Sequence, residues 1–231
     1  MTLKNIVLSA LLLPGIFACT TLKKDNLVKN NFNFAQKQLK YAIACTDTVL
    51  NSDRNKEHRL TNPRSLEKDG SLRIVRSRDW CSGFFPGSLW QMYAYTHDNY
   101  WKEEAHKRTM LIEDVKMYNG THDLGFILYT SFGKGYELTN NEKYKEVLLQ
   151  AAKTLSTRFS AKVGAIRSWD FNREKWQYPV IIDNMLNLEL LFRATQISGD
   201  STYYNIAVSH ANVTMKNHFR SDYSSYHVIN Y

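Results

Sequence analysis

Two aspartates stand out among the residues that could perform acid–base chemistry. Asp123 lies in the string HDLGF and Asp183 in the string PVIIDNMLNLELL, and each stands where an apolar helix is expected to begin. A carboxylate at a helix start often only caps free backbone N–H groups. The alternative is a general acid and base, for which one carboxylate needs a pKa raised by burial. Aromatic residues that could line a sugar-binding cleft favour the alternative: Trp80, Phe84, Phe85, Trp90, Phe126, Tyr129, Phe132, Trp169, Phe171 and Trp176.

Two histidines and one loop could serve the same site. His122 precedes Asp123 and could orient that carboxylate or touch a ligand, and His227 lies in the aromatic turn YSSYHV. The loop RSWDFN over residues 167–172 carries Trp169 shortly before the Asp183 helix. A loop this aromatic either folds over the mouth of a cleft or plugs the core.

Several other kinds of chemistry lack their signatures in this sequence. The seven histidines are scattered, without an HExxH string or a Cys–His cluster, so we expect no metal and no cofactor. No GxSxG string is present, and residues 131–139 (SFGKGYELT) are interpreted as a loop because their glycines fail the dinucleotide fingerprint. The net charge of +8 is spread along the chain without a nucleic-acid-binding motif, so we expect no nucleic acid, whereas an acidic glycan is compatible with it.

The first 30 residues have the layout of an exported bacterial lipoprotein. Lys4 is followed by an apolar run and by IFAC at residues 16–19, which resembles a lipobox. We expect a signal peptide over residues 1–18, a lipid on Cys19, a tether over 19–30 and one domain over 31–231, held on the bacterial envelope in the periplasm or at the cell surface. Phe17 is unusual in a lipobox, which leaves plain secretion open. Cys45 and Cys81 are expected as small buried side chains, with a disulfide between them left open.

The rest of the chain predicts an all-α fold built of helical hairpins. Three pairs are expected, each with a more apolar helix followed by a more charged one that returns. The apolar helices begin near Trp80, Asp123 and Asp183, so stacking of the hairpins should bring these residues to one rim. The expected helices cover residues 34–50, 84–96, 100–117, 124–132, 141–159, 183–197 and 201–219, with a short strand over 72–75.

The chain resembles bacterial unsaturated glucuronyl hydrolases, glycoside hydrolase family 88, from about Asp79 to Tyr231. The resemblance rests on the ordered strings DWCSGFFPGSLW, HDLGFILYTSFG, RSWDFNREKWQYPVIIDNMLNLELL, SGDSTYYNIAVSHANVTMKNHF and SYHVINY. It implies an (α/α)6 toroid that removes 4,5-unsaturated uronic acid from the non-reducing end of lyase-generated oligosaccharides. In that family water adds to the vinyl ether of the sugar ring, and the resulting hemiketal opens spontaneously.

The resemblance also implies roles for individual residues. Asp183 matches the proton donor, and Asp123 matches a second essential carboxylate, which either acts as a nucleophile or holds sugar hydroxyls. Trp169 matches a ring that stacks on the sugar and His227 a histidine that contacts it, while Trp80 and His122 are further candidates for substrate binding. Because the reaction is a hydration, the distance rule for retaining and inverting glycosidases does not apply.

The sequence is shorter than the family pattern, whose members continue through further helix pairs. About seven helices are expected, whereas a closed ring of six hairpins needs about twelve. We therefore expect an incomplete (α/α)6 toroid, whose exposed inner helices favour self-association. Two functions are carried forward. One is an exported hydrolase of unsaturated uronate-terminated oligosaccharides, and the other is an inactive or carbohydrate-binding remnant of such an enzyme.

Overall fold

The computed structural model describes the backbone of residues 17–231 and the side chains of residues 26–231. The chain divides into two compact units, 1–41 and 42–231, and helix α1 (Phe17–Leu50) belongs to both. Residues 19–30, predicted as a tether, are helical, since neither Pro nor Gly interrupts them. The signal peptide falls largely outside the described backbone and the Cys19 side chain outside the described side chains, so both stay predictions. Among the described helices, none is both long and apolar enough to cross a membrane.

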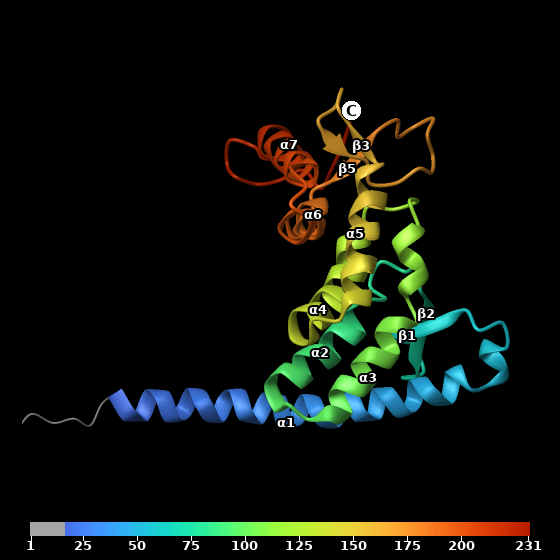
Figure 1. The fold of residues 1–231 in the computed structure, drawn as a ribbon, viewed down its shortest axis with the longest axis vertical. Coiled ribbons are helices and arrows are strands. Elements are labelled where there is room, and N and C mark those ends of the chain that lie inside the picture. The colour runs from blue at the N-terminus through green and yellow to red at the C-terminus, as the bar shows by residue number, and fades with distance from the viewer. Residues whose placement is uncertain (1–16) are drawn as a thin grey trace, which may run out of the picture. The chain divides into compact units, whose positions relative to one another are not determined.

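The unit over residues 42–231 is built of the predicted helical hairpins (Figure 1). Helix α2 (Phe84–Thr96) packs on α3 (Asn99–Met110), and α6 (Asn184–Ser198) packs on α7 (Ser201–His218). Between these two pairs, a third forms where the π-helix η3 (Gly125–Gly133) continues into α4 (Lys134–Thr139) and packs on α5 (Glu142–Ser156). Asn141, where a helix was expected to begin, caps α5, and Asp200, the residue before the helix expected over 201–219, caps α7.

Several predicted helix boundaries are wrong: the helix expected over residues 34–50 begins at Phe17, and the one expected over 141–159 ends at Ser156. The helix expected over residues 100–117 ends at Met110, and a separate 3-10 helix, η2 (Glu113–Met117), follows it. The loop expected over 131–139 is helical throughout. A Cβ at position 135 would lie 2.6 Å from the ring of Tyr144 and 3.0 Å from that of Trp90. Glycine at this position of the helix therefore lets the two buried rings pack directly against the backbone.

Short antiparallel strand pairs occupy the connections between helices. β1 (Leu60–Leu66) pairs with β2 (Leu72–Arg76); β2 was predicted, whereas β1 and the 3-10 helix η1 (Asp53–Asn55) were missed because the segment is charged and rich in turn residues. β3 (Phe159–Ser160) pairs with β4 (Ala165–Ile166). β5 (Pro179–Ile181) pairs with β6 (Val228–Asn230), which returns the last described residues to the start of α6.

The core between the hairpins is aromatic as well as aliphatic. Tyr144 of α5 packs edge-on against Trp90 and Phe132, with ring centroids 6.0 and 5.3 Å apart, and all three rings are fully buried. Trp90 Nε1 donates a hydrogen bond of 3.0 Å to Thr109 Oγ1, so its polar atom is satisfied. Cys81 is buried as predicted, Cys45 is half-buried, and both are free thiols.

Candidate active site

Close backbone contacts bring the starts of three helices to one end of the hairpin stack. A Cβ on Gly83, just before α2, would collide with the backbone carbonyl of Ile127 in η3. A Cβ on Gly125, the first residue of η3, would lie 2.6 Å from Cα of Asn187 in α6. Only glycine permits these approaches, so the sequence itself draws α2, η3 and α6 together where they begin.

Neither aspartate caps its helix, so the interpretation of Asp123 and Asp183 as simple helix caps is excluded. Asp183 immediately precedes α6, yet its side chain accepts no hydrogen bond from the first turn. At the start of η3, the N–H of Phe126 donates instead to Asn187 Oδ1 at 2.8 Å, so α6 supplies the cap that Asp123 does not. Both carboxylates are left available for other partners.

His122 lies between the two carboxylates. Its Nε2 is 3.2 Å from Oδ1 of Asp123 and 3.8 Å from Oδ1 of Asp183. The ring is 3 % exposed, so it sits behind the carboxylates. Both an orienting and a substrate-binding role are predicted for His122, and its burial favours the orienting role.

Ser168 fixes the orientation of the His122 ring. The Ser168 hydroxyl lies 3.2 Å from His122 Nδ1 and accepts a hydrogen bond from the N–H of Ile181 at 2.9 Å. The hydroxyl can donate its proton to Nδ1 or accept one from it, according to the tautomer of the ring. The other ring nitrogen, Nε2, faces the aspartates. Nothing in the sequence around Ser168 signals this role.

The two aspartates have opposite electrostatic environments. Burial raises the pKa of Asp183 and is the largest effect; His122 lowers this pKa by less, the nearby charge of Asp123 raises it further, and His227 lowers it least. Burial also acts to raise the pKa of Asp123, but hydrogen bonds from His122 and Thr121 and the charges of His122 and Arg158 outweigh it, so the net shift is downward. Two carboxylates pushed apart in this way can act as a proton donor and a permanent anion.

Direct contacts explain this difference. Asp123 Oδ2 accepts a hydrogen bond of 2.5 Å from the Thr121 hydroxyl, and its side chain is 17 % exposed. Asp183 Oδ1 is buried and has no hydrogen-bond partner among the described groups, while the side chain as a whole is 41 % exposed. Asp183 is therefore the acid that is both poorly stabilised as an anion and open to a ligand.

The strand pair β5–β6 brings His227 to Asp183. The backbone carbonyl of His227 accepts a hydrogen bond of 3.0 Å from the N–H of Ile182, the residue before Asp183. The His227 side chain is exposed. His227 is predicted from the sequence to contact a ligand, and its place beside the more open carboxylate is compatible with that prediction.

Six of the aromatic residues predicted to line a cleft form two clusters, whereas Trp90 and Phe132 of the same set lie fully buried in the core and line no cleft. Trp80 packs against Phe84 and Phe126, with centroids 5.9 and 6.0 Å away, and Phe126 lies three residues after Asp123. Trp169 stacks on Phe171 at 5.3 Å and 16° and follows Ser168, the residue that holds His122. Phe171 is 63 % exposed, so this loop lies at the surface and does not plug the core.

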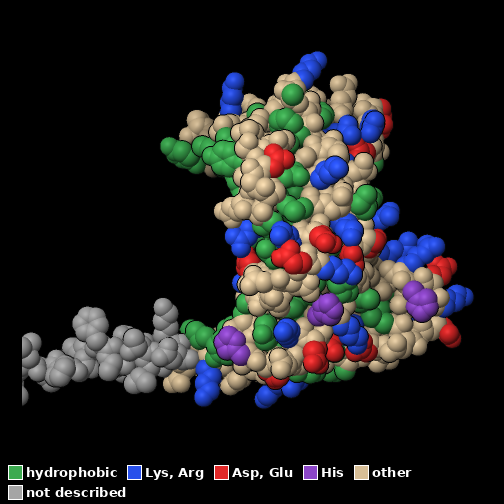
Figure 2. All heavy atoms as spheres, in the orientation of Figure 1, with side chains coloured by type: hydrophobic (Ala, Val, Ile, Leu, Met, Phe, Trp, Pro, Cys, Tyr) green, Lys and Arg blue, Asp and Glu red, His purple; other side chains and the backbone are tan. Residues whose placement is uncertain are grey.

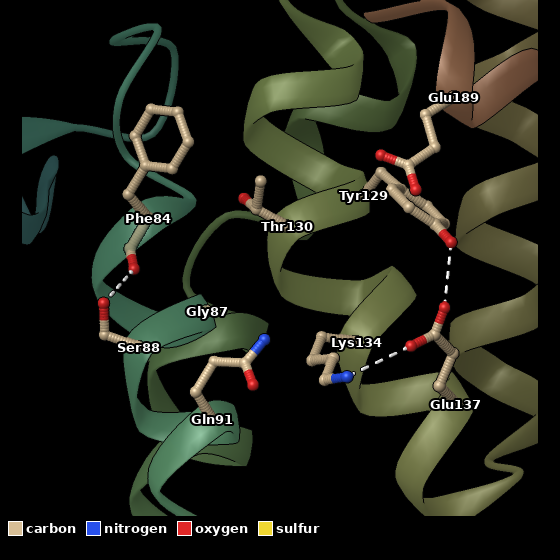
Figure 3. A pocket seen from close by; sticks show the side chains of 9 residues that line it. All are labelled: Phe84, Gly87, Ser88, Gln91, Tyr129, Thr130, Lys134, Glu137 and Glu189. Atoms are coloured by element: carbon tan, nitrogen blue, oxygen red, sulfur yellow. Dashed lines mark hydrogen bonds and ion pairs between the residues drawn. The ribbon is translucent and has the colours of Figure 1, made fainter. Parts of the chain in front are cut away.

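A cavity of about 390 Å³ extends from the first aromatic cluster between the inner helices (Figure 3). Phe84 and Gln91 of α2 line one side, and Lys134 and Glu137 line the other, with Glu189 of α6 above them. The Tyr129 hydroxyl donates to Glu137 Oε1 at 2.9 Å, and Lys134 pairs with the same carboxylate at 3.3 Å. The helices predicted to be inner therefore do face a common hollow, whose wall is charged below the aromatic rim.

No group of three or more histidines, cysteines, aspartates or glutamates suited to a metal ion occurs among the described residues.

Comparisons with known proteins identify relatives of this chain. No protein-family model matches the chain. An unsaturated glucuronyl hydrolase of Formosa agariphila is 56% identical over 171 residues, which cover 73% of this chain and 43% of that protein. An unsaturated chondroitin disaccharide hydrolase of Streptococcus pyogenes serotype M1 is 30% identical over 230 residues, covering 97% of this chain and 54% of that protein.

Solved structures agree with the sequence comparison. The crystal structure of an unsaturated glucuronyl hydrolase specific for heparin matches with a TM-score of 0.74 and 44% identity, over 86% of this chain and 52% of that one. The described hairpins are therefore part of an (α/α)6 toroid, as the resemblance implied. The chain spans about half the length of the relatives that it matches.

Proposed function

Since the chain belongs with the unsaturated glucuronyl hydrolases in sequence and in fold over the part of their length that it spans, we propose that the protein hydrolyses unsaturated uronides. The observation that carries the proposal is the contrast between Asp183 and Asp123, two neighbouring carboxylates with pKa values shifted in opposite directions. This contrast is what a hydration needs, because one group must deliver a proton while the other stays ionised.

In the proposed reaction Asp183 gives its proton to the alkene carbon of the unsaturated uronate. The hydroxyl of a water adds to the adjacent ring carbon, and the proton that the water releases returns to Asp183. The hemiketal formed in this way opens and frees the rest of the saccharide. Asp183 suits the role because burial and the charge of Asp123 raise its pKa, and because its side chain is open on one side.

Asp123 is proposed to hold the sugar in position. Its carboxylate stays ionised and is fixed by His122 and Thr121, so it can accept hydrogen bonds from sugar hydroxyls. Addition of water to a double bond requires no covalent intermediate with the protein, so a nucleophilic role for Asp123 is unnecessary. Trp169, Trp80 and His227 are the proposed contacts to the sugar rings, while His122 is a positioning residue.

The proposed substrates are disaccharides and oligosaccharides that lyases release from glycosaminoglycans. Support comes from relatives named for chondroitin disaccharides and for heparin, and from the net charge of +8, which favours acidic ligands.

The test is the loss of ultraviolet absorbance from the conjugated double bond of an unsaturated heparin or chondroitin disaccharide. We expect the absorbance to fall with the wild-type chain and product to be released, whereas a disaccharide with a saturated uronate remains intact. A folded sample that binds the unsaturated disaccharide without consuming it would instead support a carbohydrate-binding remnant.

Export and lipid anchoring are also proposed, from the sequence of residues 1–19. The support is the apolar run followed by IFAC, which places Cys19 where bacterial lipoproteins are acylated. A bacterial host expressing the gene should incorporate radiolabelled palmitate into the wild type but not into Cys19→Ser. Self-association is a further proposal, and a sedimentation experiment that finds only monomer would rule it out.

A further inference from the structure

A second hollow of about 450 Å³ lies away from the carboxylates, at the open end of the β1–β2 hairpin. Arg59, Arg76 and Arg78 line it from the hairpin side, and Leu111 and Asp114 line it from the connection between α3 and η2. Figure 2 shows Lys and Arg side chains over the region of this hairpin, with some Asp, Glu and His side chains among them.

The register of the hairpin explains why the arginines meet. Leu60 pairs with Arg76 across the two strands, so Arg59 and Arg78 flank the same end of the ladder. The Thr61 hydroxyl is buried and donates to the carbonyl of Val75 at 3.0 Å, which ties the strands together beneath the pocket. The arginines are therefore carried by ordered backbone and not by a free loop.

The positive charge of the pocket is poorly neutralised. Arg76 and Arg78 form no ion pair with any described residue, and Arg59 pairs with Glu57 at 3.1 Å only through side chains that are more than half exposed. Such an exposed pair contributes little. Asp114 is the one acid in the lining, and it accepts a hydrogen bond from the Ser77 hydroxyl at 3.2 Å.

Arg78 is also preoriented for a ligand. Its guanidinium lies over the ring of Tyr118, 4.5 Å from the centroid. A ring on one face leaves the N–H edges of the guanidinium available for two parallel hydrogen bonds. Carboxylate and sulfate groups can accept these two hydrogen bonds at once. The ammonium group of a lysine in place of Arg78 could not donate them in this parallel geometry.

We infer that this pocket binds a sulfate or carboxylate group of an acidic glycan at a site separate from the reacting double bond. The identity of the ligand rests on the proposed function, in which acidic saccharides are the substrates. The segments that line the pocket also lead to the active site: Arg78 is two residues before Trp80, and η2 ends six residues before Asp123. The occupant is then a sugar of the same saccharide chain beyond the terminal uronate.

The test is a binding measurement with a saturated heparin tetrasaccharide, which has no double bond to hydrate, so its result does not depend on turnover. We expect Arg76→Gln/Arg78→Gln to weaken binding about tenfold, the effect of losing two charge-assisted contacts at an exposed site. Arg54→Gln/Arg73→Gln is the matched control, because it removes the same charge from exposed residues near or on the hairpin that do not line the pocket. The control should lose less than twofold.

Equal losses in the two double variants would mean non-specific attraction and would overturn the inference, as would no loss in either. Arg76→Lys/Arg78→Lys keeps the charge but removes the two-point contacts, and we expect an intermediate loss of a few fold. Melting curves equal to the wild type would establish that these surface variants are folded. Failure of the proposed hydrolysis would show as an unchanged double bond in the disaccharide assay, independently of this result.

Discussion

Oδ1 of Asp183 lies 3.8 Å from Nε2 of His122, while the same nitrogen lies 3.2 Å from Oδ1 of Asp123. One buried imidazole thus faces two carboxylates and approaches Asp123 more closely. Asp123 gains a second hydrogen bond from Thr121, whereas Asp183 Oδ1 gains none from the described groups. The inequality of these contacts makes Asp183 the easier of the two to protonate.

Replacing Asp123 should lower the pKa of Asp183. The negative charge of Asp123 is one of the causes that raise this pKa, after burial itself, and Asn carries no charge. We expect the carboxyl carbon of Asp183, followed by 13C NMR, to titrate at lower pH in Asp123→Asn than in the wild type. His227→Gln should move it upward, because His227 is among the groups that lower it. A shift in the same direction in both variants would contradict the electrostatic assignment.

Asp183→Asn should stabilise the protein at neutral pH. The folded-state pKa of Asp183 lies above its unfolded value, so its contribution to stability is fully present below about pH 3.8 and is lost as the pH rises through the raised pKa. Asn imitates the neutral acid, so we expect Tm to increase by about 2 °C at pH 7 and hardly at all near pH 3. Asp123→Asn should instead lower Tm at pH 7, since the pKa of Asp123 is depressed in the folded state. Thermal scans at the two pH values decide the matter, and a lower Tm of Asp183→Asn at pH 7 would refute it.

Gly125→Ala should separate the two aspartates. Its added Cβ would lie 2.6 Å from Cα of Asn187, so η3 must move away from α6, at a cost of about 1–3 kcal/mol. Gly135→Ala is the control, because it also overpacks, but against the rings of Tyr144 and Trp90 in the core. Both variants should melt earlier, yet only Gly125→Ala should change the pKa of Asp183. The same pKa in both would show that the close approach at Gly125 does not set the site.

Thr214→Val should stabilise the fold, because Thr214 Oγ1 is buried without a described hydrogen-bond partner. It lies on α7 between His210 and His218, each of which also has an unpartnered buried Nε2. Burial lowers the pKa of His210 to about 4, so that ring is neutral at pH 7. Valine keeps the shape of Thr214 and removes the unsatisfied hydroxyl, which should raise the free energy of unfolding by about 1 kcal/mol.

Thr154→Val is the matched control for Thr214→Val. The Thr154 hydroxyl donates to the carbonyl of Lys116 at 2.6 Å, so its loss should destabilise by about 1 kcal/mol. Urea denaturation compares the two variants. Equal destabilisation by both would mean that the Thr214 hydroxyl is satisfied in solution by groups such as ordered water.

The helices were predictable from sequence where an apolar stripe and a cap coincide. Residues 84–96 were predicted without error, and α7 begins at Ser201 as expected, with Asp200 as its cap. The helical path through Gly133 and Gly135 was missed, because Gly135 serves contact with the ring of Trp90, which is distant in the sequence, and Gly133 leaves room for the ring of Tyr129 one turn earlier. The π-helical form of η3 was missed for a similar reason, since the hydrophobic pattern does not distinguish it from an α-helix.

The candidate site was predictable in its carboxylates but not in what holds them. Asp123 and Asp183 were found from their positions at helix starts, and the structure places them around one imidazole. Ser168, which orients His122, and Asn187, which replaces Asp123 as a cap, are more than 40 residues away in the chain from the groups they bond. Contacts of that range depend on the packing of the hairpins and leave no local pattern in the sequence.

The most direct test of the account is the pH dependence of turnover for the wild type and Asp183→Asn on one unsaturated disaccharide. We predict that wild-type kcat falls as the pH rises through the raised pKa of Asp183. The Asp183→Asn variant should keep its fold, lose this fall of kcat with pH, and have a kcat lower by a factor of about 10²–10⁴. A folded Asp183→Asn that hydrates the disaccharide within a few fold of the wild-type rate would contradict it.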